Sequence, residues 1–281
     1  MAALPYDASR TALFTPQNRP TLFIPGQTYD VHALCVEAAR LAYVHAENGG
    51  AELQTLTDAL AIVGFEPPTC FSDPTTGTQG FGAIRQADDL ALLAFRGTEP
   101  NEFTDIATDL KASLVSWPES AGRVHDGFAA ATRSILPAVK QWLAQSHGQL
   151  IITGHSLGAA IACLMASVCK PKTLVTIGCP RVGDAAFKAT LDEIDHTRFV
   201  DCCDIVTELP PEIDGYVHVA PMTYITSAGA IDTTATDATI SADRAAARTA
   251  YLCDYAWRAG TVIVRDLADH APVNYARAVF S

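Results

Sequence analysis

The chain has 281 residues, of which 49% are hydrophobic, and its formal net charge is −12. This apolar content is enough for a large packed core and excludes a mainly disordered chain. The acidic balance disfavours a nucleic-acid partner, which requires clusters of Lys and Arg, and disfavours binding to anionic membranes through charge alone.

Signals for targeting, metals and cofactors are missing from the sequence. No apolar run approaches the roughly 20 residues of a membrane-spanning helix. The opening stretch, MAALPYDASRTALFTPQNRP, has neither a basic region nor a continuous apolar segment, so no secretory signal peptide is visible. Eight cysteines are scattered through apolar segments without a C-x-x-C pair. They predict buried free thiols in a reducing compartment such as the cytoplasm, and they give no support to a zinc ribbon.

The first third of the chain contains one clear helix and one clear hairpin. Residues 29–47 carry apolar side chains at helical spacing and predict a helix. Residues 81–86 and 90–95 predict two strands joined by a turn at 87–89.

The centre of the chain predicts a helix, a strand and a second helix. The first helix is expected over 129–148, bent at Pro137 and ended by Gly148. An apolar strand over 150–153 follows, and an alanine-rich helix over 157–167 comes almost directly after it.

The last third continues the alternation of strands and helices. Strands are expected over 173–178, 197–201 and 216–226, the last of them at the sheet edge. Residues 227–242 predict a loop, and residues 241–260 predict a capped helix. The alternation predicts a single α/β domain over residues 1–281, with a mostly parallel central sheet flanked by helices.

The stretch Gly154-His155-Ser156-Leu157-Gly158 fits the G-x-S-x-G pattern of a nucleophile elbow, here after a central strand. The two glycines let the strand and the helix pass closely, while Ser156 stands on a sharp turn with its hydroxyl above the sheet. The following helix points its N–H groups at developing negative charge, so the Leu157 N–H is expected to be an oxyanion donor. A plain helix N-cap serine is the alternative.

A serine hydroxyl needs a base to activate it, and in the elbow fold the base follows the serine and the acid along the chain. His196 precedes the favoured acid and breaks that order. His218 alternates with two valines, which indicates a structural residue on a strand. His270, in a loop that enters a short helix near the C-terminus, is therefore the predicted base.

The acid that orients the base is expected just past a strand end, at the carboxyl edge of the sheet. Asp201 and Asp204 both fit, but Asp201 closes the strand itself, so Asp204 is preferred. Asp269, beside the predicted base, is interpreted as a surface acid that caps the final helix.

Several signatures in order reinforce this interpretation. They are AFRGT at 94–98, VHDGF at 124–128, TGHSLGAA at 153–160, GCPRVGD at 178–184, DIVTELPP at 204–211 and DHAPVNY at 269–275. With these motifs the chain resembles the class 3, fungal-type lipases of the α/β-hydrolase superfamily. The resemblance implies that Ser156, Asp204 and His270 form the catalytic triad. It departs from the family's late H-x-x-Y spacing, because Tyr275 follows His270 by five positions.

The resemblance also implies roles for residues around the triad. Thr98, which follows Arg-Gly, corresponds to the family's second oxyanion donor. Arg96 and His125 match positions that brace the loops around the serine, and Gly154, His155 and Gly158 support the elbow.

In this family the segment after the oxyanion residue carries a mobile lid, here 99–120. Apolar residues recur in it at helical spacing: Phe103, Ile106, Leu110, Leu114 and Trp117. We expect an amphipathic helix that opens at a lipid–water interface, with a fixed helix packed on the core as the alternative.

The sequence therefore predicts a serine carboxylic-ester hydrolase that works through an acyl-enzyme, most nearly a triacylglycerol lipase. This serine chemistry is expected to need no metal and no cofactor. A phospholipase A1 and a short-chain carboxylesterase remain open, because they would use the same residues. A non-catalytic lipid- or partner-binding member of the fold is the alternative from a different class. Neither the natural ester nor the oligomeric state can be read from the sequence.

Overall fold

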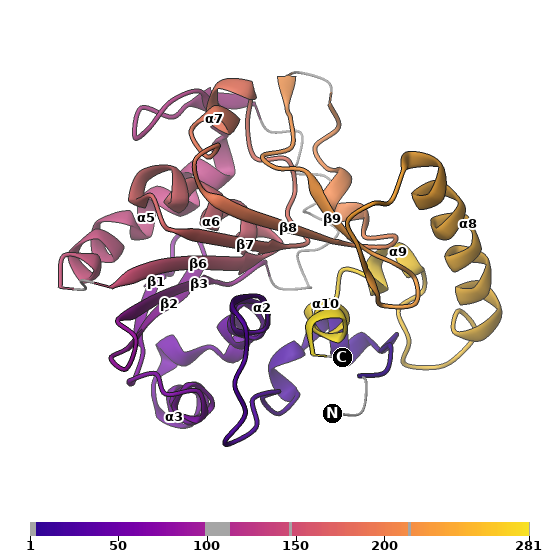
Figure 1. Ribbon diagram of the computed structural model, residues 1–281, viewed down its shortest axis with the longest axis horizontal. Helices are drawn as coiled ribbons and strands as arrows, with labels where there is room; N and C mark the ends of the chain where they lie inside the picture. Colours follow the sequence, from indigo (N-terminus) through magenta and orange to yellow (C-terminus); the bar gives the residue numbers. More distant parts are fainter. Residues whose placement is uncertain (1–3, 99–112, 146–147, 213–214, 281) are drawn as a thin grey trace.

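The computed structural model describes residues 4–98, 113–145, 148–212 and 215–280 of the chain. Within these residues an eight-stranded sheet crosses the molecule and carries helices on both faces (Figure 1). Its strands, in spatial order, are β1 (Thr69–Asp73), β2 (Thr78–Arg85), β3 (Leu90–Phe95), β6 (Gln149–His155), β7 (Thr173–Ile177), β8 (Asp195–Asp201), β9 (Met222–Ile225) and β10 (Ile231–Asp232). A separate hairpin pairs β4 (Leu114–Ser116) with β5 (Arg123–His125).

The centre of the sheet is parallel and its two edges are antiparallel. Strands β3, β6, β7, β8 and β9 run parallel to one another. At the edges, β1 pairs antiparallel with β2, β2 with β3, and β10 with β9. Parallel strands place their carboxyl ends at one edge, where loops gather side chains from distant parts of the chain.

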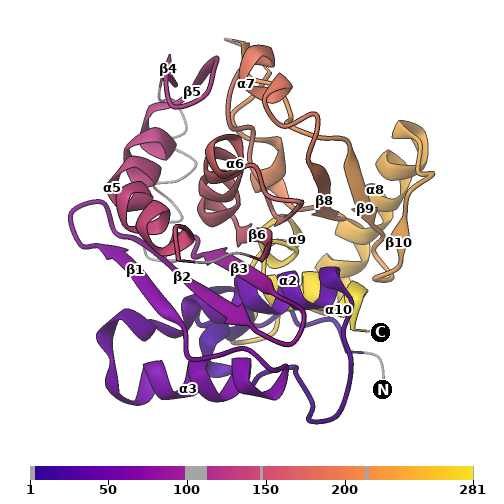
Figure 2. The same cartoon turned by 60° about the vertical axis from the view of Figure 1, so that its left-hand side comes forward.

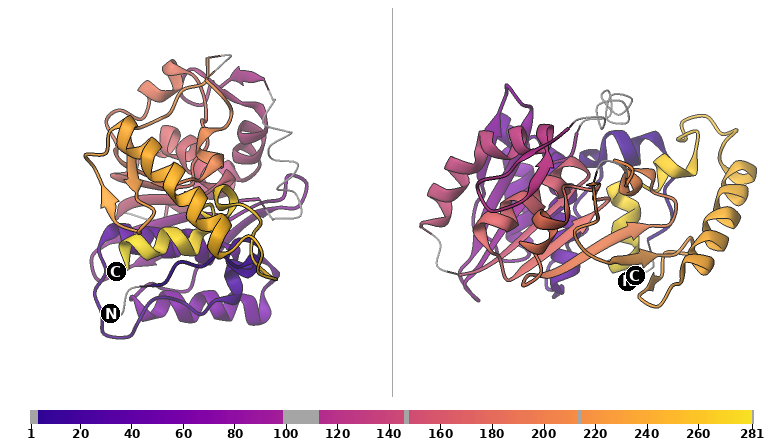
Figure 3. Two further views of the ribbon diagram at one scale, coloured as in Figure 1. Left: turned by 90° about the vertical axis from the view of Figure 1, so that its right-hand side faces the viewer. Right: turned by 90° about the horizontal axis from the view of Figure 1, so that it is seen from above.

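Helices cover the sheet in two layers (Figures 1 and 2). They are α1 (Arg10–Phe14), α2 (Val31–Leu41), α3 (Gly50–Ile62), α5 (Asp126–Leu143), α6 (Leu157–Cys169), α7 (Ala185–Ala189), α8 (Asp237–Asp254), α9 (Arg265–Ala268) and α10 (Pro272–Val279). Helices α5 and α6 pack on one face, and α2, α3 and α10 pack on the other. Helix α8 lies beyond β9, at the end of the sheet opposite to α5 (Figure 3).

The sequence explains why the central strands are buried on both faces. All residues of β7 are buried, and so are those of β3 apart from the first. Helix α6 is rich in alanine and other small residues, so its backbone packs closely against the sheet. Such continuous apolar strands are typical of parallel sheets sandwiched between helices. The predicted α/β-hydrolase fold with a mostly parallel central sheet is confirmed.

The predicted hairpin of β2 and β3 is confirmed, whereas two predicted helix ends are wrong. Residues 29–47 do not form one helix, because α2 ends at Leu41 and His45 adopts a left-handed conformation with φ of 56°. Gly148 does not end α5, whose C-cap is Ala144. A side chain on Gly148 would instead meet the Asp89 backbone carbonyl oxygen, only 1.8 Å from the added carbon.

Two predictions beyond β8 are also wrong. The strand expected over 216–226 is limited to β9 and is not at the edge, because β10 lies outside it. The loop expected over 227–242 contains β10 and the first turns of α8. Helix α8 starts early because Thr236 and Thr239 cap it reciprocally, each side chain accepting a bond from the other's backbone N–H.

The lid expected over 99–120 falls mainly outside the described residues, which resume at 113. Its last part is not helical: residues 114–116 form β4, and Trp117 is buried, with its indole Nε1 donating to Ser167 Oγ at 3.0 Å. Among the residues that the structure describes, no helix has both the length and the apolar character needed to cross a membrane.

Candidate active site

Ser156 occupies the sharp turn between β6 and α6. Its φ of 58° and ψ of −125° are strained for a non-glycine residue, a feature that clusters at functional sites. The Ser156 N–H donates to the carbonyl oxygen of Ile177, at the end of the neighbouring strand β7, at 3.1 Å. The serine is therefore held by its backbone, and its hydroxyl has no hydrogen-bond partner among the described residues.

The two glycines of the motif are required by close contacts on both sides of the turn. A Cβ added to Gly154 would lie 2.2 Å from the carbonyl oxygen of Gly158. A Cβ added to Gly158 would lie 2.1 Å from the carbonyl oxygen of Phe95, at the end of β3. Strand, helix and neighbouring strand thus meet at a spacing that excludes any side chain at these two positions.

Asp204 and His270 are brought together although they are 66 residues apart in sequence. The His270 Nδ1 lies 2.9 Å from Asp204 Oδ1 and 2.8 Å from Oδ2, and both side chains are fully buried. A carboxylate only accepts, so Nδ1 carries the proton and Nε2 of a neutral ring is left as the base.

Tyr275 adds a third group to this pair. Its hydroxyl donates to Asp204 Oδ2 at 2.5 Å, while the Val206 N–H donates to Oδ1 at 2.9 Å. Burial and the nearby charges of Asp204 and Asp201 raise the pKa of Tyr275 well above its usual value, so the phenol stays a donor. Sequence reasoning noted the five-residue spacing from His270 only as a departure from the family pattern and missed the contact of Tyr275 with the acid.

Gly178 links the elbow to the imidazole. It follows Ile177, whose carbonyl oxygen holds the Ser156 N–H, and it has a φ of +60°. A Cβ on Gly178 would lie 2.9 Å from His270 Cε1 and 3.1 Å from Asp204 Oδ2. The end of β7 therefore lies against both the serine turn and the Asp–His pair.

His155 holds His270 from the other side. The His155 Nε2 donates to the His270 carbonyl oxygen at 2.7 Å, so its Nδ1, 2.7 Å from Tyr43 Oη, accepts from that hydroxyl. Burial and the nearby His270 lower the pKa of His155 well below its usual value, which agrees with a neutral ring. The two imidazole rings lie 4.5 Å apart between centroids. Sequence reasoning assigned His155 to the elbow alone and missed Tyr43, which carries no motif.

The expected oxyanion donors lie at either side of the serine. A Cβ on Gly97 would be 2.9 Å from Ser156 Cβ and 2.2 Å from Tyr43 Oη, so this backbone passes directly over the serine. Thr98 comes next and is partly exposed. Leu157 is the first residue of α6, where the helix dipole directs backbone N–H groups at negative charge.

Arg96 and His125 occupy different surroundings. The Arg96 guanidinium donates to His45 Nδ1 at 2.8 Å, which fixes the end of β3 to the segment after α2. His125 begins α5 as its N-cap and stacks on Phe128 with ring centroids 4.2 Å apart. Arg96 thus anchors the strand that leads into Thr98, while His125 belongs to the start of α5.

The competing acids are buried in a separate cluster. Asp269 is not the surface cap that was expected: it accepts from Tyr6 Oη at 2.7 Å, the Cys203 N–H at 2.9 Å and Arg265 Nε at 3.0 Å. Asp201 Oδ1 accepts from the Cys202 N–H. Burial, together with the charge of Asp269, raises the pKa of Asp201 well above its usual value.

The same cluster contains the candidate metal ligands Cys202, Cys203 and Asp269, which offer atoms within 4.8 Å of one another. The Asp269 carboxylate is already used by a phenol, an arginine and a backbone N–H. The neighbouring thiol, burial and Asp269 raise the pKa of Cys202, so its thiol stays protonated. These donors suit a hydrogen-bonded core better than a metal ion.

The remaining histidines lie elsewhere. His196, on β8, has its Nε2 3.0 Å from Thr176 Oγ1 on β7. His218 is not on a strand as expected, and it lines a pocket with several arginines.

A mostly parallel sheet with a strained serine after β6 and a buried Asp–His pair at its carboxyl edge defines an α/β-hydrolase. Residues 92–213 match the family model for class 3 lipases. Over these residues the chain is similar to class 3 lipases.

Individual proteins named as lipases are also similar to this chain. The secreted mono- and diacylglycerol lipase A of Penicillium cyclopium is 33% identical over 181 residues, covering 56% of this chain and 55% of that protein. A lipase of Rhizopus niveus is 31% identical over 177 residues, covering 57% of this chain and 44% of that protein. The chain spans about half the length of these curated relatives. The crystal structure of a lipase from Rhizopus microsporus var. chinensis superposes with a TM-score of 0.58 at 25% identity, covering 80% of this chain and 84% of that chain.

Proposed function

We propose that this protein is a serine carboxylic-ester hydrolase that acts on lipid esters. Ser156 is the nucleophile, His270 the general base and acid, and Asp204 the group that orients the imidazole. The observation that carries the proposal is the buried His270–Asp204 pair, whose Nδ1 contact leaves Nε2 as the base. The strained Ser156 turn is held by Ile177, and the next residue, Gly178, lies against His270.

The first half of the reaction forms an acyl-enzyme. His270 Nε2 takes the Ser156 hydroxyl proton as Oγ attacks the ester carbonyl carbon. The N–H groups of Thr98 and Leu157 stabilise the oxyanion, and each is expected to contribute about 10²–10³ in turnover. The imidazolium then donates its Nε2 proton to the departing alcohol, while Asp204 stabilises the positive ring.

The second half releases the acid. Water gives a proton to His270 Nε2 and attacks the acyl carbonyl, and the returning proton restores the Ser156 hydroxyl. The buried Asp204 is held in place by three donors, namely Tyr275, the Val206 N–H and the histidine. This arrangement needs no metal and no cofactor.

Kinetics on p-nitrophenyl butyrate test the assignment. Ser156→Ala is expected to remove essentially all turnover, leaving at most the residual that other site groups supply. Ser134→Ala is the matched control, because that serine lies in α5, where its hydroxyl donates to the Ala131 carbonyl oxygen and contacts the Thr76 hydroxyl. Near-native turnover in Ser156→Ala, with the control unchanged, would contradict the proposal.

The substrate class is proposed to be a neutral acylglycerol. The relatives reported above are named as a mono- and diacylglycerol lipase and a lipase. The net charge of −12 also favours neutral over anionic lipid aggregates. Rates on p-nitrophenyl esters of rising chain length, on triacylglycerol emulsions and on phosphatidylcholine vesicles separate a lipase from a short-chain esterase and a phospholipase A1.

We also propose that the enzyme works at a lipid–water interface. Four large exposed apolar side chains fall in one short segment around the end of α8, namely Leu252, Trp257, Ile263 and Val264. Trp257 is 72% exposed, which suits insertion into a lipid surface. Trp257→Ser should lower activity on an emulsion while sparing p-nitrophenyl butyrate. Equal losses of activity on both substrates in the variant would contradict interfacial action. So would a native rate that rises hyperbolically with substrate concentration, without a jump where the substrate separates from water.

A reducing compartment, such as the cytoplasm, is proposed because all eight cysteines, each within the described residues, are free thiols. Thiol titration of unfolded protein purified without reductant should count eight thiols. A lower count caused by disulfides would contradict this location.

A further inference from the structure

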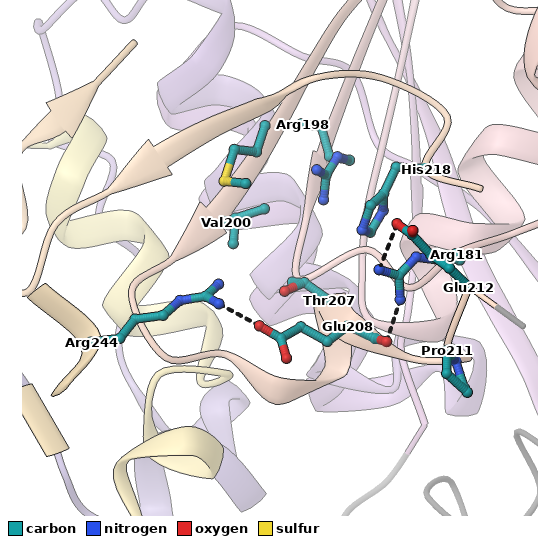
Figure 4. A pocket seen from close by; sticks show the side chains of 10 residues that line it. Arg181, Arg198, Val200, Thr207, Glu208, Pro211, Glu212, His218 and Arg244 are labelled. Atoms are coloured by element: carbon teal, nitrogen blue, oxygen red, sulfur yellow. Dashed lines mark hydrogen bonds and ion pairs between the residues drawn. The ribbon is translucent and has the colours of Figure 1, made fainter. Parts of the chain in front are cut away.

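A pocket apart from the serine turn lies between β8, the short 3-10 helix Ile205–Glu208 and the segment that leads into β9. Its volume is about 460 Å³. Figure 4 shows that three arginines, Arg181, Arg198 and Arg244, line it together with His218 and two glutamates, Glu208 and Glu212. A positive pocket contrasts with the acidic balance of the whole chain.

The charges in this pocket do not cancel. Arg181 pairs with Glu212 at 3.1 Å, and Arg244 pairs with Glu208. Arg198 has no carboxylate partner among the described residues. Within the described residues, one guanidinium charge therefore lacks a counterion.

Arg198 is also the most buried of the three arginines, with 2% of its surface exposed. Its Nε donates to the Ala220 carbonyl oxygen at 2.9 Å, but its Nη1 has no partner within the described part of the chain. A buried guanidinium with an unmet donor is costly, and an anion in the pocket would supply the missing acceptor.

Two more polar atoms at the same pocket lack partners in the described residues. They are Nε of Arg181, on the segment after β7, and Nδ1 of His218, on the segment before β9. Burial, with a smaller contribution from the charges of Arg198 and Arg181, lowers the pKa of His218 to about 3. Donors from three separate chain segments thus converge on one cavity.

We propose that this pocket binds a phosphate group, with Arg198 Nη1 as the central donor and Arg181 Nε and His218 Nδ1 as flanking donors. Several donors around one cavity suit a tetrahedral oxyanion better than a planar carboxylate, and guanidinium groups match phosphate oxygens geometrically. The volume admits more than a bare ion, so the phosphate belongs to a small phosphate monoester or to a lipid headgroup.

The site adjoins the catalytic machinery without belonging to it. Thr207 and Glu208 line the pocket, and the Thr207 hydroxyl donates to the Asp204 carbonyl oxygen at 2.8 Å. Arg181 also donates to the Pro210 carbonyl oxygen at 2.8 Å. A bound phosphate would therefore contact the turn that carries the acid, which gives the pocket a route to influence the triad.

Calorimetric titration with inorganic phosphate and with glycerol 3-phosphate, at fixed ionic strength set by chloride, tests the soluble source. Co-sedimentation with vesicles of phosphatidylcholine, with and without phosphatidic acid, tests the headgroup source. Saturable binding in the first arm identifies a soluble ligand, and pelleting that requires phosphatidic acid identifies a lipid. Either result supports the proposal provided that the binding is weakened by substitution of Arg198.

Arg198→Met keeps the length of the side chain and removes its charge. It should weaken phosphate binding about 10- to 100-fold. Arg133→Met is the control, because Arg133 is a surface residue of α5 that pairs with Glu119. Circular dichroism confirms folding, and His218→Phe is a second variant for the case in which Arg198→Met does not fold. Absence of saturable binding in both arms for the native protein, or equal binding in the Arg198 and Arg133 variants, overturns the site.

Discussion

The Tyr275 hydroxyl donates to Asp204 Oδ2 at 2.5 Å and so joins α10 to the turn after β8. The same carboxylate also receives the His270 imidazole and the Val206 N–H. Asp204 is completely buried, and each of these donors offsets part of the cost of burying its charge. The tyrosine is therefore a positioning residue for the acid, acting through Asp204 on the base.

Tyr275→Phe should keep the fold and remove one donor from this buried carboxylate. Loss of a hydrogen bond to a buried charged group costs about 1–3 kcal/mol, so the free energy of unfolding should fall by that amount. Turnover should fall as well, with little change in KM, because the histidine is less well oriented. Urea denaturation and steady-state kinetics measure both effects. Unchanged stability and kcat would remove Tyr275 from the site.

Asp204→Asn tests the orientation of the base more severely. The amide can donate to His270 Nδ1 and so favours the tautomer that carries the proton on Nε2, where it cannot accept from Ser156. On this ground kcat should fall by about 10⁴, as for the equivalent change in serine proteases. A fall of less than tenfold in a folded variant would mean that another acid orients His270.

Gly158→Ala tests the close packing beneath the elbow. The new Cβ would lie 2.1 Å from the Phe95 carbonyl oxygen, which is backbone and cannot move aside alone. Overpacking of this kind costs about 1–3 kcal/mol or more, and it should also displace Ser156 and reduce turnover. Gly127→Ala in α5 is the matched control, since its nearest neighbour would be a His125 side-chain atom at 3.3 Å. Comparable thermal stability for the two variants would contradict the tight contact.

Stability should fall on acidification partly because of His196. Burial and Arg198 lower the pKa of His196 to about 3, whereas the unfolded chain has an ordinary value near 6.5. Between these values the unfolded state binds one more proton, so this contribution is complete above about pH 6.5 and is lost progressively as the pH falls toward 3. The slope is about 1.4 kcal/mol per pH unit for this residue.

His196→Gln removes that slope and keeps a polar group near Thr176. Urea denaturation at several pH values between about 7 and 5 should show a flatter dependence in the variant. Asp201, whose pKa is raised, contributes a pH dependence of the opposite sign in both proteins. Subtracting the free energy of unfolding of the native protein from that of the variant at each pH removes this shared contribution. Parallel curves for the two proteins would mean that His196 titrates alike in the folded and unfolded states.

Much of the fold was predictable because its signals are local. Continuous apolar runs predicted β3, β7 and the core of β8, and the small residues of α6 predicted a helix packed closely on the sheet. The misjudged boundaries depend on side-chain caps and tertiary contacts. Thr236 starts α8 through a Thr–Thr cap that lacks the usual acidic partner, and Gly148 is fixed by a contact with the distant Asp89.

The residues of the candidate site likewise include some that local sequence patterns predict and some that depend on distant contacts. Ser156, Asp204 and His270 were predicted from their order and from turns at strand ends, which a linear sequence records. Tyr43 and the His155 ring act through contacts across 112 residues, so no local pattern marks them. The interpretation of Asp269 failed because exposure at a helix start was assumed, whereas Tyr6 and Arg265 bury it.

The central claim is that the Ser156 hydroxyl is activated by His270. The most direct measurement is labelling with a fluorophosphonate probe, followed by mass spectrometry of the modified peptide. The account predicts one label per chain, on Ser156, with labelling strongly slowed in His270→Ala and absent in Ser156→Ala. A label on another residue, or folded native protein that remains unlabelled, would contradict it.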